Sequence, residues 1–257
     1  MRVALVQTSL HWENPIANRL TLESKILSCP KKFDLLILPE MFTSGFTMNP
    51  ERVAETMDGE SILWLKSLAK SKKTAITGSL VIEEEGNYYN RLVFVFPDGA
   101  IQYYNKRHLF TLAGEEEVYT KGEKKLVVEY KDWKICPLIC YDLRFPVFAR
   151  NIENYDLLVY VANWPKPRIQ AWDALLKARA IENMCYVAAV NRIGSDANGM
   201  PYVGHSQVID ELGNEIVAPF EEDAIKVITL DKKKVTESRN KFNFLKDKDV
   251  FEIKRDT

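Results

Sequence analysis

Cys140 has the residue type and the position in the sequence that suit nucleophilic catalysis. It follows the strand-like stretch 134–139 and precedes a polar turn and Pro146, where an apolar run of helical character begins. At such a junction, free backbone N–H groups and the helix dipole would stabilise a thiolate, the form that attacks carbonyl carbon. An isolated cysteine is nevertheless more commonly a buried structural thiol, so a catalytic role for Cys140 requires partners elsewhere in the chain.

Glu40 and Lys106 are the charged residues that could act together with this thiol. Glu40 follows 34–39, an apolar run typical of a strand buried on both faces. A carboxylate at a buried strand end can serve as a proton acceptor near neutral pH. Lys106 lies between aromatic and apolar residues after a hairpin strand, where its ammonium could stabilise an oxyanion. The alternatives are a charge at a helix N-terminus for Glu40 and a surface lysine on an edge strand for Lys106.

The composition of the chain narrows the classes of function. The 257 residues suffice for one large α/β domain or two small ones, and a formal net charge of −1 favours neither nucleic acid nor an anionic membrane as a partner. We find no apolar run of membrane-spanning length and no signal peptide, so we expect a cytoplasmic protein. The four cysteines lack metal-type spacing, which indicates reduced thiols rather than disulfides or a metal site.

The elements that would position these groups alternate between strand and helix in the first and third quarters of the chain. We predict strands at 2–8, 34–39, 74–81, 88–96, 101–105, 126–130, 133–139, 157–162, 186–190, 206–209, 216–218 and 224–230. We predict helices at 15–28, 61–71, 147–152 and 169–183, and a terminal helix that begins at 231. This order predicts mixed sheets with outer helices, and no linker or internal repeat divides the chain.

Three stretches together resemble a known family. Leu38–Phe42, Tyr103–Phe110 and Ile139–Pro146 are similar, in order and in flanking residues, to the Glu-Lys-Cys triad motifs of the nitrilase superfamily of carbon–nitrogen hydrolases. The resemblance extends from Val3 to Ile216. It implies one domain over residues 1–257, folded as a four-layer α-β-β-α sandwich with mixed sheets.

The resemblance also assigns a role to each residue of the triad. Cys140 would attack an amide carbon, and Glu40 would carry protons from the thiol to the leaving amine. Lys106 and the backbone N–H of Tyr141 would stabilise the oxyanion. No metal and no organic cofactor is implied, and the expected partner is a small-molecule amide.

A second, auxiliary glutamate is also implied by the resemblance. The matching stretch contains Glu115, Glu116 and Glu117 in succession, which leaves the assignment ambiguous. The spacing to Tyr119 and Gly122 favours Glu115, which would position Lys106 or the attacking water. For the other two glutamates we favour an exposed loop.

The stretches 163–168, 178–183, 191–196 and 202–206 look most like those of the omega-amidase branch. Members of that branch hydrolyse 2-oxoglutaramate and 2-oxosuccinamate to the dicarboxylic oxo acids and ammonia. N-carbamoyl-amino-acid hydrolysis, or hydrolysis of another small amide or a nitrile, is the alternative within the superfamily. A binding module with an inactive site is the alternative from another class, although all three triad residues are present.

An oxo-acid substrate carries a carboxylate, so its pocket needs a fixed cation. Arg144 is the first candidate, and its alternative role is a salt bridge to Asp142. Trp164 and Phe42 would wall the pocket, with plain core packing as an equal alternative for Phe42. We expect Arg168 and Arg192 to be structural or rim residues.

The resemblance further implies a homodimer. A C-terminal extension at about 232–257 would lie over a twofold partner. Its apolar residues, at 242, 244, 245, 250 and 251, stand among charged residues and would suit an interface, or they could fold back on their own domain.

Overall fold

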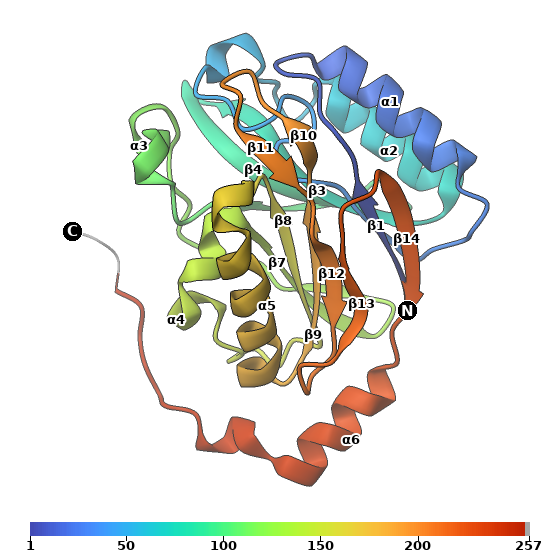
Figure 1. Cartoon of the computed structure of the whole chain (residues 1–257), viewed down its shortest axis with the longest axis vertical. Helices are drawn as coiled ribbons and strands as arrows, with labels where there is room; N and C mark the ends of the chain where they lie inside the picture. The colour runs from blue at the N-terminus through green and yellow to red at the C-terminus, as the bar shows by residue number, and fades with distance from the viewer. Residues whose placement is uncertain (255–257) are drawn as a thin grey trace.

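Two six-stranded mixed sheets lie face to face in the computed structural model, which describes residues 1–254 (Figure 1). The first sheet has the spatial order β14 (Ala224–Thr229), β1 (Arg2–Gln7), β2 (Leu35–Ile37), β3 (Ala75–Glu84), β4 (Asn87–Val95), β5 (Ile101–Asn105). The second has the order β13 (Glu215–Phe220), β12 (Ser206–Ile209), β9 (Tyr186–Asn191), β8 (Leu157–Ala162), β7 (Trp133–Ile139), β6 (Val128–Tyr130). A hairpin of β10 (Ile193–Ser195) and β11 (Pro201–Val203) forms a separate two-stranded sheet.

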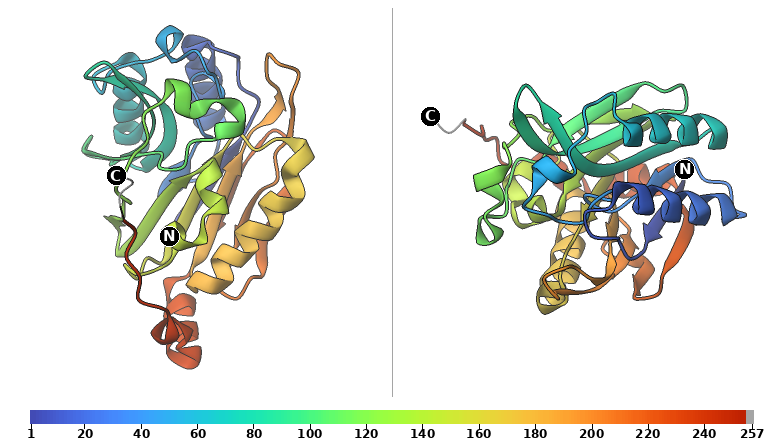
Figure 2. Two further views of the ribbon diagram at one scale, coloured as in Figure 1. Left: turned by 90° about the vertical axis from the view of Figure 1, so that its left-hand side faces the viewer. Right: turned by 90° about the horizontal axis from the view of Figure 1, so that it is seen from above.

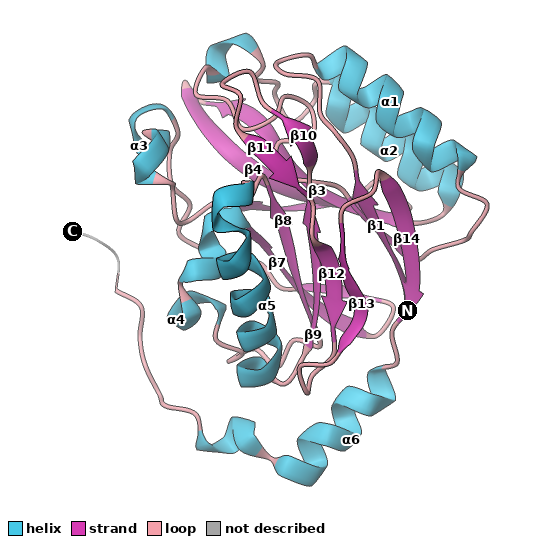
Figure 3. Cartoon of the chain, viewed as in Figure 1, coloured by secondary structure: helices cyan, strands magenta, loops and turns pink. Residues whose placement is uncertain are grey.

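Helices cover the outer faces of both sheets, which confirms the α-β-β-α layering (Figures 2 and 3). The first sheet carries α1 (Pro15–Ser28) and α2 (Glu60–Lys72), and the second carries α4 (Pro146–Ala149) and α5 (Ile169–Asn183). A short α3 (Glu115–Val118) lies between β5 and β6, and α6 (Lys232–Phe242) follows β14. Short 3-10 helices occur at Pro50–Arg52, Thr111–Ala113, Cys140–Arg144, Lys166–Arg168 and Phe244–Asp247.

Strand β1 shows how each sheet buries both of its faces. Val3 and Leu5 belong to the core between the two sheets, whereas Ala4 and Val6 pack with the apolar faces of α1 and α2. Successive side chains of a strand point to opposite faces, so a strand covered on both sides must be apolar throughout. The unbroken apolar runs of the sequence follow from this arrangement.

The two sheets repeat one pairing pattern. Three parallel strands, β1–β2–β3 in the first sheet and β7–β8–β9 in the second, have one antiparallel neighbour on one side and two on the other. No repeat is visible in the amino-acid sequence that would have predicted this repeated pairing. Because of this pairing, the C-terminal ends of β2, β7 and β8 meet at one edge of the sandwich, where the backbone N–H of Asn163 donates to the Glu40 carboxylate.

The chain after β7 forms less helix than the sequence predicted. The helix expected over 147–152 is one turn, Pro146–Ala149, and the residues from Cys140 to Arg144 form a 3-10 turn. Arg150 leaves the helical region with φ −59° and ψ 132°, which ends the helix.

The C-terminal region begins with α6, whose first turn is capped by the side chain of Asp231. Beyond α6 the chain extends along the outside of the molecule (Figure 1). The last three residues of the predicted extension, 255–257, lie outside the described part of the chain. No helix within residues 1–254 is long and apolar enough to cross a membrane.

Candidate active site

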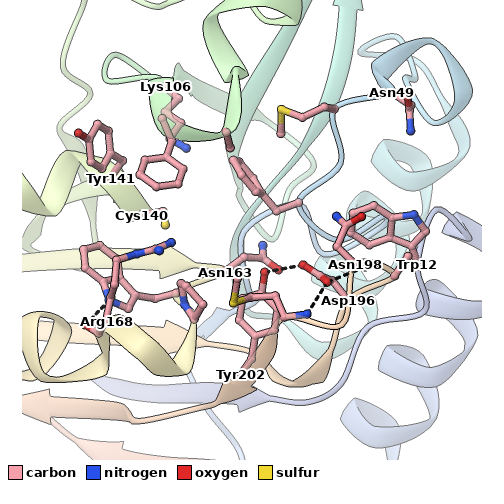
Figure 4. Close-up of a pocket in the computed structure, with 18 of the residues that line it drawn as sticks. Trp12, Asn49, Lys106, Cys140, Tyr141, Asn163, Arg168, Asp196, Asn198 and Tyr202 are labelled. Carbon is pink, nitrogen blue, oxygen red and sulfur yellow. Dashed lines mark hydrogen bonds between the residues drawn. The ribbon is translucent and has the colours of Figure 1, made fainter.

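The structure brings Glu40, Lys106 and Cys140 together from three strand ends. Glu40 follows β2, Lys106 follows β5 and Cys140 follows β7. Lys106 Nζ donates to Glu40 Oε1 at 3.0 Å, and the charges of both residues act on the pKa of the Cys140 thiol. Lys106 and Cys140 face the same cavity (Figure 4). Residues separated by up to 100 positions therefore form one cluster.

Glu115 is the glutamate of the 115–117 run that enters this cluster. Lys106 Nζ lies 2.9 Å from Glu115 Oε1 and 2.8 Å from Oε2, and the Phe110 amide donates to Oε2 at 2.6 Å. Glu115 is buried, whereas Glu116 and Glu117 are exposed on α3. The geometry thus distinguishes among three glutamates that the sequence left ambiguous.

Lys106 lies between two carboxylates, and its charge state follows from them. Burial alone would lower its pKa, but the negative charges of Glu115 and Glu40 outweigh burial and raise the pKa above its ordinary value. For Glu115, burial raises the pKa in spite of the attraction of Lys106. One ammonium between two carboxylates leaves a net charge of about −1 if the thiol is neutral.

Among the described residues, no group of three His, Cys, Asp or Glu side chains could hold a metal ion.

Two asparagines that the sequence analysis did not single out fix the Glu40 carboxylate. Asn90 Nδ2 donates to Oε1 at 2.8 Å, and the backbone N–H of Asn163 donates to Oε2 at 2.8 Å. Asn163 Nδ2 also donates to the backbone carbonyl of Glu40 at 2.7 Å. The only local signal for Asn90 was the polar pair Asn90 and Arg91 inside a strand of mainly aromatic and aliphatic residues, where a buried polar side chain must find a partner.

Cys140 sits in a strained turn, and its surroundings favour the neutral thiol. Its φ of 42° lies in the left-handed region, which residues other than glycine rarely adopt and which is enriched at functional sites. Burial raises the pKa of the thiol well above its usual range, and the negative charge of Glu40 raises it further, against the effect of Lys106. The helix expected after Cys140 is only a five-residue 3-10 turn, so the helix dipole that was expected to stabilise a thiolate is largely missing there.

A cavity of about 500 Å³ opens above Cys140 (Figure 4). Aromatic residues from both halves of the chain contribute to its walls: Trp12, Phe46, Phe110, Tyr141, Trp164 and Tyr202. Trp164 was predicted as a wall, and Tyr141 was predicted to contact the substrate through its backbone N–H. Phe42 was predicted as a wall but does not line the cavity: it is fully buried and packs 6.1 Å from the Trp64 ring in the core beneath α2.

Arg144 lines the cavity without a carboxylate partner among residues 1–254. Its guanidinium lies 5.0 Å from the centre of the Trp164 ring, and the residue is exposed. Asp142, the alternative partner that we considered, accepts a hydrogen bond from His108 Nδ1 at 2.7 Å instead. The cavity therefore has a cation available for an anionic ligand.

The other two arginines of the sequence analysis differ in their positions. Arg168 also lines the cavity, with its guanidinium 5.1 Å from the centre of the Phe110 ring. Arg192 is buried, and its Nη2 donates to the carbonyls of Leu10 at 3.3 Å and Ser195 at 3.0 Å, so its role is structural.

Comparisons with known proteins agree with this geometry. A model of the carbon–nitrogen hydrolase family matches residues 2–240. "Omega-amidase YafV" of Escherichia coli (strain K12) is 40% identical over 255 residues, which cover 98% of each protein. The 2-oxoglutaramate amidase of Bacillus subtilis (strain 168) is 33% identical over 242 residues, covering 92% of this chain and 93% of that protein.

Among solved structures, XC1258 from Xanthomonas campestris superimposes with a TM-score of 0.96 at 44% identity, covering 99% of both chains. That protein is described as a CN-hydrolase superfamily member with an arsenic adduct in its active site.

Proposed function

Because the chain belongs to the carbon–nitrogen hydrolase family, we propose that it hydrolyses the ω-amide of a small oxo acid, such as 2-oxoglutaramate or 2-oxosuccinamate, to the dicarboxylic acid and ammonia. Two kinds of relative support this substrate class, namely omega-amidases and 2-oxoglutaramate amidases that align over nearly the whole chain. The observation that carries the proposal is that Arg144, which has no carboxylate partner within residues 1–254, lines the same cavity as Cys140.

Acylation begins from the neutral thiol. As Cys140 Sγ attacks the amide carbon, its proton passes to Glu40, and the carbonyl electrons move to the oxygen. Lys106 Nζ and the backbone N–H of Tyr141 stabilise the oxyanion. When the tetrahedral intermediate collapses, the C–N bond breaks, Glu40 gives its proton to the nitrogen, ammonia leaves and a thioester remains.

Deacylation uses the same groups in reverse. Glu40 takes a proton from water as the water oxygen attacks the thioester carbon. The C–S bond then breaks, and the sulfur recovers a proton from Glu40. Glu115 keeps Lys106 charged and in place through both steps, because it accepts hydrogen bonds from Nζ with both oxygens. The sum of the steps is amide plus water to carboxylic acid plus ammonia.

A substrate panel tests the proposed function. Ammonia release should be fastest with 2-oxoglutaramate or 2-oxosuccinamate, compared with N-carbamoyl amino acids, aliphatic nitriles and uncharged amides of similar length. A carbamoyl substrate would also yield carbon dioxide, which identifies the alternative activity. Preference for a carbamoyl amino acid or a nitrile over both oxo-acid amides would contradict the proposal.

Replacement of Arg144 should weaken binding of the substrate carboxylate. A hydrogen bond to a charged group contributes about 1.5–3 kcal/mol, so Arg144→Met should lower kcat/KM for 2-oxoglutaramate by about 10-fold to 150-fold, mainly through KM. Methionine keeps the side chain's apolar stem over Trp164. Steady-state kinetics with 2-oxoglutaramate and with butyramide, which lacks a carboxylate, measures the effect.

Arg168→Met is the matched control, since Arg168 is the second arginine of the cavity. We expect a smaller loss than for Arg144→Met. Equal losses on the charged and uncharged amides would show that Arg144 does not recognise the carboxylate, and a larger loss for Arg168→Met would transfer that role to Arg168.

We further propose a homodimer, built in part by the segment after α6. Phe244 is 59% exposed, and Val250 is fully exposed to solvent. Exposed apolar residues of this kind suit a subunit interface. Phe244→Ser combined with Val250→Ser should shift the sedimentation coefficient from dimer to monomer. A monomeric wild-type protein at micromolar concentration would contradict the dimer.

We also propose that the protein acts in a reducing compartment, the cytoplasm. All four cysteines are free, and the nucleophile must remain a thiol to react.

A further inference from the structure

We propose that Asp142 is a positioning residue that holds Lys106 and Cys140 at the separation needed for attack on an amide carbonyl. This inference rests on the proposed amidase reaction. Asp142 is fully buried, lies two residues after the nucleophile and does not line the cavity. It therefore acts through other residues rather than on the substrate.

On one side, Asp142 holds the turn that carries the nucleophile. Its Oδ2 accepts the backbone N–H of Ile139 at 3.0 Å, across Cys140 and Tyr141, the two residues that lie between them. Cys140 has the left-handed φ of 42°, a conformation that persists only where surrounding contacts impose it. The Ile139–Asp142 hydrogen bond closes the turn around this strained residue.

On the other side, the same carboxylate holds the segment that carries Lys106. Asp142 Oδ2 accepts the Tyr104 hydroxyl at 2.8 Å, and Oδ1 accepts the His108 backbone N–H at 3.2 Å and its Nδ1 at 2.7 Å. Tyr104 precedes Lys106 by two residues, and His108 follows it by two. Asp142 thus contacts both flanks of the lysine.

Two further contacts stiffen this connection. The Tyr104 hydroxyl accepts the backbone N–H of Arg107 at 2.9 Å, so the hydroxyl both donates to Asp142 and folds the lysine segment. The His108 ring stacks on Phe145 at 3.8 Å between centroids with an interplanar angle of 4°, which joins the lysine segment to the end of the nucleophile turn. Arg179 also supports the nucleophile turn, since its guanidinium donates to the Leu143 carbonyl at 2.6 Å. This contact ties the turn to α5 rather than to the segment that carries Lys106.

A charged carboxylate suits this position better than its neutral isostere. Asp142 accepts four hydrogen bonds with its two oxygens, and all four partners are donors. Asparagine has one acceptor oxygen, and its NH2 group would face an N–H or O–H donor. The substitution Asp142→Asn therefore preserves volume and breaks one half of the connection.

The catalytic consequence concerns distance. The sulfur must reach the carbonyl carbon while Lys106 Nζ reaches the oxygen of the same carbonyl, and a misplacement of about 1 Å can cost about 100-fold in rate. We expect Asp142→Asn to lower kcat for 2-oxoglutaramate by about 30-fold to 100-fold and to leave KM within about 2-fold, since the cavity walls are unchanged.

Asp156→Asn is the matched control. Asp156 is also a buried carboxylate: it accepts the Lys134 backbone N–H at 3.0 Å and pairs with Lys232 at 3.0 Å. It precedes β8, at the end of the sheet opposite to the active site. This variant should lose thermal stability to a similar degree as Asp142→Asn but keep kcat within about 2-fold.

Alkylation of Cys140 by iodoacetamide, followed by mass spectrometry of the peptides, supplies a readout that needs no substrate. If Lys106 moves away from the sulfur, the thiolate forms less readily, and alkylation of Cys140 should slow several-fold. Alkylation of the partly exposed Cys29 should not change. Tyr104→Phe removes one of the four donors and should lower kcat about 3-fold to 10-fold with KM unchanged, which keeps the proposal testable if Asp142→Asn does not fold.

Wild-type kcat and wild-type alkylation in either variant would overturn the role of Asp142. A loss of kcat in Asp142→Asn that is no larger than the loss in Asp156→Asn would also overturn it. Failure of the proposed function is distinct from these outcomes: the wild-type protein would then release no ammonia from ω-amides, while the alkylation rates would still report on Asp142.

Discussion

Replacement of Cys140 by alanine should abolish ammonia release from 2-oxoglutaramate, with a loss in kcat of at least about 10⁴-fold. No other cysteine among the described residues is placed to substitute for it: Cys136 and Cys185 are buried in the core, and Cys29 is at the end of α1. Glu40 and Lys106 would remain, but a carboxylate and an ammonium without the sulfur cannot form the thioester. An ammonia assay over several hours measures the residual rate.

Cys136→Ala and Cys29→Ser are the controls for this experiment. Both should retain kcat within about 2-fold per folded molecule, because neither side chain reaches the cavity. Acid quenching of the wild-type reaction followed by mass spectrometry should detect an acyl adduct on the peptide that contains Cys140. An adduct elsewhere, or ammonia release by Cys140→Ala near the wild-type rate, would eliminate the cysteine mechanism.

The elements with strong periodic patterns were predicted best. The boundaries of β7 and α5 are the predicted ones, Trp133–Ile139 and Ile169–Asn183, because a long apolar alternation or a long helical stripe leaves few alternatives. The β10–β11 hairpin was missed. Its strands have three residues each and are stabilised partly by a bridge between Ile193 and Ser9, a distant partner that no local pattern reveals.

Glu40, Lys106 and Cys140 could be picked out because each follows a recognisable strand and their flanking residues resemble known motifs, whereas their environment could not be predicted. Phe42 was expected in the pocket, but Met41 adopts a φ of 43°, and the chain reverses immediately after Glu40. The reversal points Phe42 into the core, and its backbone N–H bonds to the Ser79 carbonyl at 3.0 Å. The possible salt bridge between Asp142 and Arg144 also could not be judged from the sequence. The two residues are close in the chain, but the partners of Asp142 come from the segment around Lys106.

Replacement of Lys106 by methionine should have the second large effect, on both activity and stability. The ammonium supplies the oxyanion with a charged donor, and removal of one oxyanion donor costs about 10²-fold to 10³-fold in kcat. We expect a loss of at least about 10³-fold, because Lys106 also holds Glu40 Oε1 at 3.0 Å. Retention of kcat within about 10-fold would contradict its role.

The stability effect of Lys106→Met follows from the two carboxylates that it leaves facing each other. Unpaired buried charge costs about 3–5 kcal/mol. Burial already raises the pKa of Glu115, and loss of the attraction of Lys106 will raise that pKa further. A carboxyl whose folded pKa exceeds its unfolded value of about 4.3 stabilises the fold below that value, and this contribution is lost as pH rises through the folded pKa. Thermal unfolding should therefore show a small deficit for the variant near pH 5 and a large one near pH 8.

The double variant Lys106→Met with Glu115→Gln separates charge from catalysis. Wild-type Glu40, Lys106 and Glu115 sum to a charge of about −1, and the double variant, with Glu40 alone, has the same sum. It should regain most of the stability lost at pH 8 and lose the pH dependence of the deficit, yet remain inactive, because nothing replaces the ammonium at the oxyanion. If its melting temperature instead matches that of the single variant at every pH, the lysine contributes through packing rather than by neutralising the two glutamates.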